Sequence, residues 1–161
     1  MTKRRHLEAI RRRAVEALRE HGLTKQGWTF QWDHAVRRFG YCRFDTQRIT
    51  ISRHLAALNT LAEAENTILH EVAHALVGHG AGHGPRWVAQ AQAIGCTGTR
   101  CYSVHVSEPP EKWIGTCPGC RAVVARKIRR PRSRRVACGR CCRQHAQGRF
   151  DARFALAWVR R

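Results

Sequence analysis

Apolar residues recur at helical spacing in three stretches of the chain, and this pattern predicts three amphipathic helices. The first helix covers residues 3–21, ends at Gly22, and buries Leu7, Ile10, Ala14, Ala17 and Leu18. The last begins at Pro85, ends before Gly95, and buries Trp87, Val88, Ala91 and Ile94. Arginines surround the apolar face of the first helix, and we interpret them mainly as a solvated surface.

The middle helix is predicted over residues 61–77, behind a capping box formed by Thr60 and Glu63. Its packed arc is expected to contain Leu61, Ile68, Leu69, Val72, Ala75 and Leu76. His70 and His74 fall on the opposite arc. This helix therefore packs by one face and presents two histidines from the other.

Alternating apolar and polar residues predict three short strands between the first two helices, around residues 28–32, 41–44 and 47–52. Asp45-Thr46-Gln47 forms the predicted hairpin turn between the second and third strands. Ser52 then occupies a helix N-cap position, and the short helix that it starts is expected to end at Leu58.

Two consecutive prolines, Pro109 and Pro110, mark residues 107–111 as a linker between a core of residues 1–106 and a second region of residues 112–161. In the second region, residues 122–125 and 134–137 are predicted to pair as a hairpin that turns at Pro131-Arg132-Ser133. The tail alternates in a strand pattern at Phe154, Leu156 and Trp158, although a helix would align Phe150, Phe154 and Trp158.

The formal charge of +19 is concentrated at the C-terminal end, because residues 121–161 carry 14 basic residues and a single acidic one. Residues 53–95, which include the histidine-bearing helix, carry a net charge of −1. We therefore expect a polyanion, with DNA first, to bind the C-terminal region; a solvated basic surface is the alternative. The expected DNA contacts are Arg126, Lys127, Arg129, Arg130, Arg132, Arg134 and Arg135.

No apolar run reaches the roughly 18 residues of a membrane span, and the N-terminus leads into no hydrophobic stretch of the signal-peptide kind. We expect a cytoplasmic protein without a membrane partner. In that compartment the eight cysteines are expected to be metal ligands or buried thiols rather than disulfides.

His70, Glu71 and His74 have the spacing of a catalytic zinc site. Residues four apart on a helix share a face, so the two histidines can bind one ion while Glu71 lies beside them. In this arrangement Glu71 takes a proton from a zinc-bound water and passes it to the leaving amine. The oxyanion donor is left open among Tyr41, His34 and His105.

Catalytic zinc needs a third protein ligand, and the sequence contains no Asp or Glu between Glu71 and Glu108. A carboxylate ligand from the next helix is therefore excluded. The remaining candidates are His79 and His83. We favour His83, because the segment from Gly80 to Gly82 lets the chain return toward the helix, whereas His79 lies just past the helix end.

A second, structural zinc site is predicted from two Cys-x-x-Cys pairs, Cys117 with Cys120 and Cys138 with Cys141. Four thiolates leave no open position for chemistry, so this ion is expected to clamp a strongly basic segment. Cys142 could replace Cys141 as a ligand. Buried thiols are the expected state of Cys42, Cys96 and Cys101, and a further metal site using Cys96 and Cys101 is a minor alternative.

Together these residues resemble the SprT-like family, which includes Spartan, the protease that degrades proteins crosslinked to DNA. The resemblance rests on Gly40-Tyr41-Cys42, Ile49-Thr50-Ile51-Ser52, the helix with His70, Glu71 and His74, the turn His83-Gly84-Pro85-Arg86-Trp87, and the four cysteines. It implies a zincin-like α+β fold, with the active-site helix on a small antiparallel sheet and a zinc ribbon after it. It also implies His83 as third ligand and a DNA-associated metallopeptidase.

These observations lead to a hypothesis of function. We expect a zinc endopeptidase, associated with the nucleoid, that cleaves proteins held on DNA by the basic ribbon. A nucleic-acid-binding zinc protein with a vestigial protease core is the first alternative. A metal-dependent nuclease is a weaker one, because no carboxylate-rich two-metal site is present in the sequence.

Overall fold

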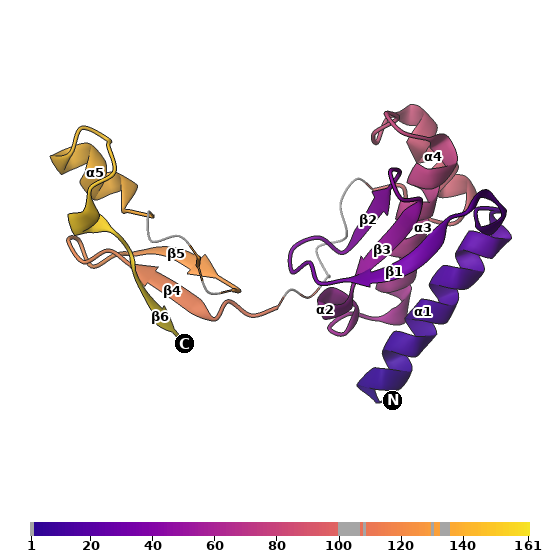
Figure 1. Ribbon diagram of the computed structural model, residues 1–161, viewed down its shortest axis with the longest axis horizontal. Coiled ribbons are helices and arrows are strands. Elements are labelled where there is room, and N and C mark those ends of the chain that lie inside the picture. Colours follow the sequence, from indigo (N-terminus) through magenta and orange to yellow (C-terminus); the bar gives the residue numbers. More distant parts are fainter. Residues whose placement is uncertain (1, 100–106, 108, 130, 133–135) are drawn as a thin grey trace. The chain divides into compact units, whose positions relative to one another are not determined.

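The structure is a computed structural model of the 161-residue chain, and it describes all residues except 1, 100–106, 108, 130 and 133–135. The chain divides into two compact units, Met1–Pro109 and Pro110–Arg161, which are described separately below (Figure 1). Among the described residues, no helix is both long and apolar enough to cross a membrane.

The first unit opens with helix α1 (Lys3–Glu20), which is capped by Thr2. Its buried face consists of the five predicted residues, Leu7, Ile10, Ala14, Ala17 and Leu18. A single turn of 3-10 helix, η1 (Thr24–Gln26), follows and leads into the sheet. The expectation of an amphipathic opening helix is thus confirmed.

The sheet of the first unit contains β1 (Thr29–Asp33), β2 (Gly40–Arg43) and β3 (Arg48–Ser52), in the order β1-β3-β2. β2 and β3 form the predicted antiparallel hairpin, whereas β1 runs parallel to β3. The sheet is therefore mixed: its central strand, β3, is antiparallel to β2 on one side and parallel to β1 on the other. This order leaves β2 at an edge of the sheet.

Two helices cover one face of this sheet: α1 packs on β1, and α3 (Leu61–Val77) packs on β2, β3 and α1 (Figure 1). The bounds and capping box of α3 are as predicted. Leu61 was expected in the packed arc, but it is 39% exposed, because the first residue of the helix projects beyond the sheet-facing turns. Ile68 and Val72 are fully buried in the core.

Two shorter helices complete the first unit. Ser52 caps α2 (Arg53–Ala56) by accepting a hydrogen bond from the backbone N–H of Leu55, and α2 ends two residues before the expected Leu58. α4 (Pro85–Ala93) begins at Pro85 as predicted and packs against α3. Of its predicted buried face, Trp87 and Ala91 are buried, and the other two residues are partly buried.

The second unit has its own antiparallel sheet, β4 (Trp113–Thr116), β5 (Val123–Lys127) and β6 (Ala157–Arg160), in the order β5-β4-β6. The tail is a strand at β6, as the alternation predicted, after a 3-10 turn, η2 (Ala152–Phe154). Gly115 on β4 makes room for β6, since a Cβ there would come within 2.9 Å of the Trp158 ring.

The predicted hairpin between residues 122–125 and 134–137 is wrong. β5 pairs with β4 instead, and Ala137 forms an isolated bridge with Ala155. Residues 133–135 lie outside the described residues. The second cysteine pair opens a helix, α5 (Gly139–His145), which the sequence analysis did not anticipate. The mixture of helices and small sheets confirms the α+β class, and the cluster of four cysteines in the second unit fits a zinc ribbon.

Candidate metal centres

Three histidine side chains converge at the open face of α3. The Nε2 atom of His83 lies 3.0 Å from that of His70 and 3.1 Å from that of His74. Zinc–nitrogen bonds of about 2.0–2.1 Å in a tetrahedral site would place ligand atoms about 3.3 Å apart, so the observed spacing is close to that of a bound ion. These three side chains can hold one metal ion.

The loop between α3 and α4, residues 78–84, determines which histidine joins His70 and His74, and we call it the glycine loop. Gly78, Gly80 and Gly82 have φ values of +88°, +91° and +54°, which side chains with a Cβ rarely adopt. The turn brings His83 to the cluster. The ring of His79 instead packs edge-on against Phe44, at 5.3 Å between ring centroids. The structure therefore brings His83, and not His79, to the two helical histidines.

Trp87 is fully buried against the cluster, with ring centroids 4.5 Å from those of His70 and His83 and 5.1 Å from that of His74. Burial, followed by the two neighbouring histidines, lowers the pKa of His70 to about 4, and burial with His83 lowers the pKa of His74 to about 4. Both rings are thus neutral near pH 7, the form that binds zinc.

A hydrogen bond also orients the ring of His70, which donates to the backbone carbonyl of Thr99. Such a bond fixes the tautomer and the direction of a metal-binding imidazole. Asn66, one turn before His70 on α3, accepts a hydrogen bond of 2.9 Å from the backbone N–H of Thr97 and so holds this segment in place. Sequence reasoning missed Thr99 and Asn66, because each of these bonds has a backbone group as one partner, and backbone groups leave no residue signature.

Glu71 is buried between α3 and the edge strand β2. A Cβ at position 40 would come within 2.6 Å of the Glu71 Oε1 atom, so only glycine permits this approach. Burial raises the pKa of Glu71 to about 8, although the backbone N–H of Cys42 donates a hydrogen bond to the carboxyl group and opposes this rise. A cation held by the histidines would favour the carboxylate form.

A cleft of about 870 Å³ opens in front of Glu71 and the three histidines. One wall is the edge strand β2, and the other is the glycine loop. Tyr41, a candidate oxyanion donor, lines this cleft. His34, another candidate, does not line it but lies near His54, with ring centroids 5.8 Å apart. His105, the third, lies outside the described residues.

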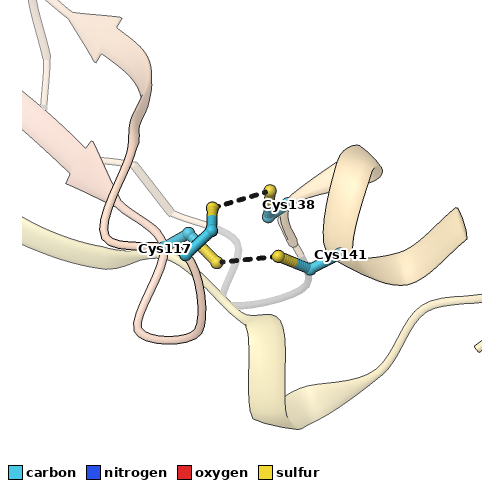
Figure 2. Close-up of side chains that lie close together, drawn as sticks. Cys117, Cys138 and Cys141 are labelled. Carbon is cyan, nitrogen blue, oxygen red and sulfur yellow. Dashed lines mark hydrogen bonds between the residues drawn. The ribbon is translucent and has the colours of Figure 1, made fainter. Parts of the chain in front are cut away.

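The four predicted cysteines of the second unit form the other candidate metal centre. Sγ of Cys117 lies 3.7 Å from that of Cys141, and Sγ of Cys120 lies 3.8 Å from that of Cys138. A tetrahedral site with zinc–sulfur bonds of about 2.3 Å gives a spacing of about 3.8 Å. Figure 2 shows the sulfurs of Cys117 and Cys141 facing each other. The four thiols therefore fit a structural zinc ion.

Within this cluster, hydrogen bonding favours the thiolate form of Cys138, whereas burial raises the pKa of Cys141 to about 12. The backbone N–H of Cys141 is the main cause that lowers the pKa of Cys138 to about 7. Cys142 is buried beside the cluster, but Cys141 is the residue that contributes to it. In the first unit Cys42 and Cys96 are buried free thiols as expected, and Cys101 lies outside the described residues.

The predicted DNA-contacting residues are found along β5 and after it. Those that the structure describes are all exposed: Arg126, Lys127, Arg129 and Arg132. The others, Arg130, Arg134 and Arg135, lie outside the described residues.

Comparisons with known proteins bear on the first unit. Searches of curated proteins and of solved structures gave no significant match. The model of the SprT-like family, by contrast, matches residues 7–108, which is more than half of the chain and contains Glu71 and all three converging histidines. The chain belongs to the SprT-like family.

Proposed function

We propose that the protein is a zinc-dependent endopeptidase that cleaves proteins bound or crosslinked to DNA. One observation carries the proposal: three histidine side chains converge beside a buried glutamate, in a cleft bordered by an edge strand. Family membership supports a metallopeptidase, because SprT-like domains are associated with zincin-like enzymes.

His70, His74 and His83 would hold the zinc ion. When bound, zinc supplies a Lewis acid that polarises the scissile carbonyl and makes water more acidic. Glu71 then acts as the base: its carboxylate accepts a proton from the attacking water and passes it to the leaving amine. Burial against Gly40 restricts the Glu71 side chain to one position, which favours proton transfer at a fixed distance.

The edge strand offers a place for the substrate backbone. Successive residues of a strand direct their N–H and C=O groups to opposite edges. The Phe39 carbonyl accepts a bond from Ser52 and thus faces β3, so Gly40 and Cys42 face the cleft. An extended peptide can pair there through the N–H and C=O of Gly40 and the C=O of Cys42, because the Cys42 N–H already donates to Glu71. This pairing would bring the peptide backbone next to Glu71.

The second unit is proposed to supply DNA binding. Its exposed arginines can form bidentate hydrogen bonds with phosphates, and the cysteine cluster would hold this repelling segment in one shape. DNA would then concentrate both the enzyme and its substrates on one polymer. We therefore expect DNA to increase cleavage of DNA-binding proteins and to leave cleavage of short peptides unchanged.

The decisive experiment measures cleavage of a DNA-binding protein by the zinc-loaded enzyme, with and without DNA. Glu71→Gln keeps the shape of the side chain but removes the base, so we expect at least about a 100-fold loss of rate. Metal analysis is the control, because the variant should retain as much zinc as the wild type. Equal rates in the wild type and Glu71→Gln, or no cleavage by either, would refute the peptidase proposal; DNA binding without any turnover would favour the vestigial alternative.

A further inference from the structure

The cleft in front of the histidines is positively charged on the side of the edge strand. Arg37 and Arg38 both line it, just before β2. Among the cleft-lining residues that the structure describes, Glu71 is the sole acidic one. A peptide in this cleft therefore lies near two guanidinium groups as well as the glutamate.

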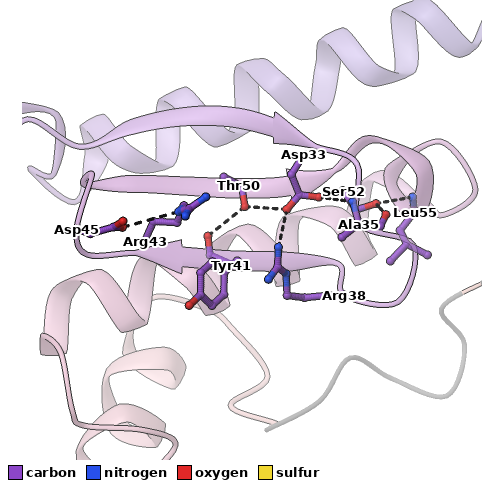
Figure 3. A network of polar contacts seen from close by, with 9 residues as sticks. All are labelled: Asp33, Ala35, Arg38, Tyr41, Arg43, Asp45, Thr50, Ser52 and Leu55. Carbon is purple, nitrogen blue, oxygen red and sulfur yellow. Dashed lines mark hydrogen bonds and ion pairs between the residues drawn. The ribbon is translucent and has the colours of Figure 1, made fainter. Parts of the chain in front are cut away.

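Arg38 is held in place by two neighbours, Asp33 and Tyr41, which Figure 3 shows in one network. Its Nη2 atom donates to Asp33 Oδ2 at 3.1 Å, and its guanidinium lies 4.4 Å from the centre of the Tyr41 ring. Asp33 is itself fixed, because the Thr50 hydroxyl donates to it at 2.9 Å and the backbone N–H of Ala35 at 2.8 Å. The arginine is thus preorganised rather than freely rotating.

In the described part of the chain, Nη2 is the one Arg38 nitrogen that hydrogen-bonds a protein acceptor. The side chain remains 51% exposed, whereas that of Asp33 is 19% exposed. The Nε and Nη1 donors of Arg38 are available to a ligand in the cleft. A carboxylate is the group that a guanidinium fork binds best among protein side chains.

The position of Tyr41 indicates which part of a substrate Arg38 would contact. Side chains alternate along β2: Gly40 and Cys42 are buried, while Tyr41 and Arg43 are exposed. A peptide paired with β2 would place alternate side chains on the Tyr41 side of the sheet. The residue opposite Tyr41 would then lie next to the Arg38 guanidinium.

We propose that Arg38, positioned by Asp33 and Tyr41 and assisted by Arg37, selects peptide segments that carry Asp or Glu at the substrate position beside Tyr41. The inference rests on the proposed peptidase function and gives that function a substrate preference. It concerns peptide side chains and not DNA phosphates, because the arginines lie inside the peptide cleft rather than on the basic second unit.

The test uses the full-length zinc-loaded enzyme and a set of short peptides in which each position near the scissile bond carries Glu, Gln or Lys in turn. We expect one position at which kcat/KM for Glu exceeds that for Lys by about fivefold or more, the scale of a partly exposed charge pair. Arg38→Gln should reduce this ratio to about twofold or less.

Arg43→Gln is the matched control, because Arg43 is also 51% exposed and lies on β2, but does not line the cleft. Its ratio should equal that of the wild type. The Glu-to-Lys ratio of kcat/KM is compared, rather than a single rate, because the charge of Arg38 also acts on Glu71 and its loss would change the rates for all peptides together. If Arg38→Gln fails to fold by circular dichroism, Arg37→Gln takes its place.

The inference is overturned if no position prefers Glu, if both variants change the ratio equally, or if excess DNA oligonucleotide abolishes the preference by occupying the arginines. Absence of cleavage of every peptide and of the DNA-binding protein would refute the proposed function instead. In that case, fluorescence anisotropy of the same peptides on zinc-loaded Glu71→Gln protein decides the preference by binding alone.

Discussion

Glu71 owes its position to a residue that takes no part in the chemistry. Gly40 has nothing beyond its Cα, and this allows the carboxyl group to lie against the edge strand. The spacing of His70, Glu71 and His74 could be predicted from the sequence, because neighbours on a helix are fixed by its period. The contact with Gly40 could not, because it joins residues 31 positions apart and depends on how α3 docks on the sheet.

Replacing Gly40 with alanine should therefore disable catalysis without emptying the metal site. The added Cβ would lie 2.6 Å from Glu71 Oε1 and 2.8 Å from Thr67 Cγ2, so Glu71 must move. A displacement of about 1 Å can reduce the rate about 100-fold, and the overpacking costs about 1–3 kcal/mol of stability. The measurements are kcat on a protein substrate, Tm and zinc content. Wild-type kcat would contradict this account, and zinc content should stay unchanged, since no histidine is touched.

At the scale of elements, the sequence predicts correctly the features that depend on neighbouring residues, and it fails for those that depend on contacts between distant residues. α3 has the predicted bounds because its capping box and apolar period lie within the helix itself. The hairpin predicted between residues 122–125 and 134–137 failed because strand pairing is a long-range choice, and β5 has a partner in β4 instead. The glycine loop is an intermediate case. Its glycines predict a sharp turn, but only the path of the turn in the structure shows that His83, and not His79, reaches the other two histidines.

The same loop gives a prediction about metal affinity. Gly80→Ala places a Cβ at a φ of +91°, whereas Gly84→Ala makes the same chemical change in the same loop at a φ of −71°. Strain of about 1–3 kcal/mol at position 80 should shift the loop and weaken zinc binding about tenfold. Gly84→Ala should bind nearly as the wild type does. Chelator competition measures both, and equal affinities of the two variants would show that the loop does not limit zinc binding.

We expect the two units to depend on metal to different degrees. The first has an extended hydrophobic core to which its sheet and the helices α1, α2, α3 and α4 contribute. In the second, the buried cluster consists of Cys117, Cys138, Cys141 and Leu156, so three of its four residues are candidate zinc ligands. Below about 40–70 residues a domain commonly needs a metal or disulfides to fold, and this unit also carries many like charges. Its folding free energy is therefore expected to come largely from zinc binding.

Zinc removal should consequently unfold the second unit and spare the first. After treatment with a strong chelator, backbone amides of β4 and β5 should lose protection from hydrogen exchange, while those of α1 and α3 keep it. Cys120→Ser should do the same at lower chelator concentration, because Cys120 is the exposed member of the cluster. DNA affinity should fall in parallel, since unfolding disperses the arginines that the fold gathers. Retained protection of β4 and β5 in the metal-free protein would mean that the sheet is stable without its ion, and the cysteine cluster would then need another explanation.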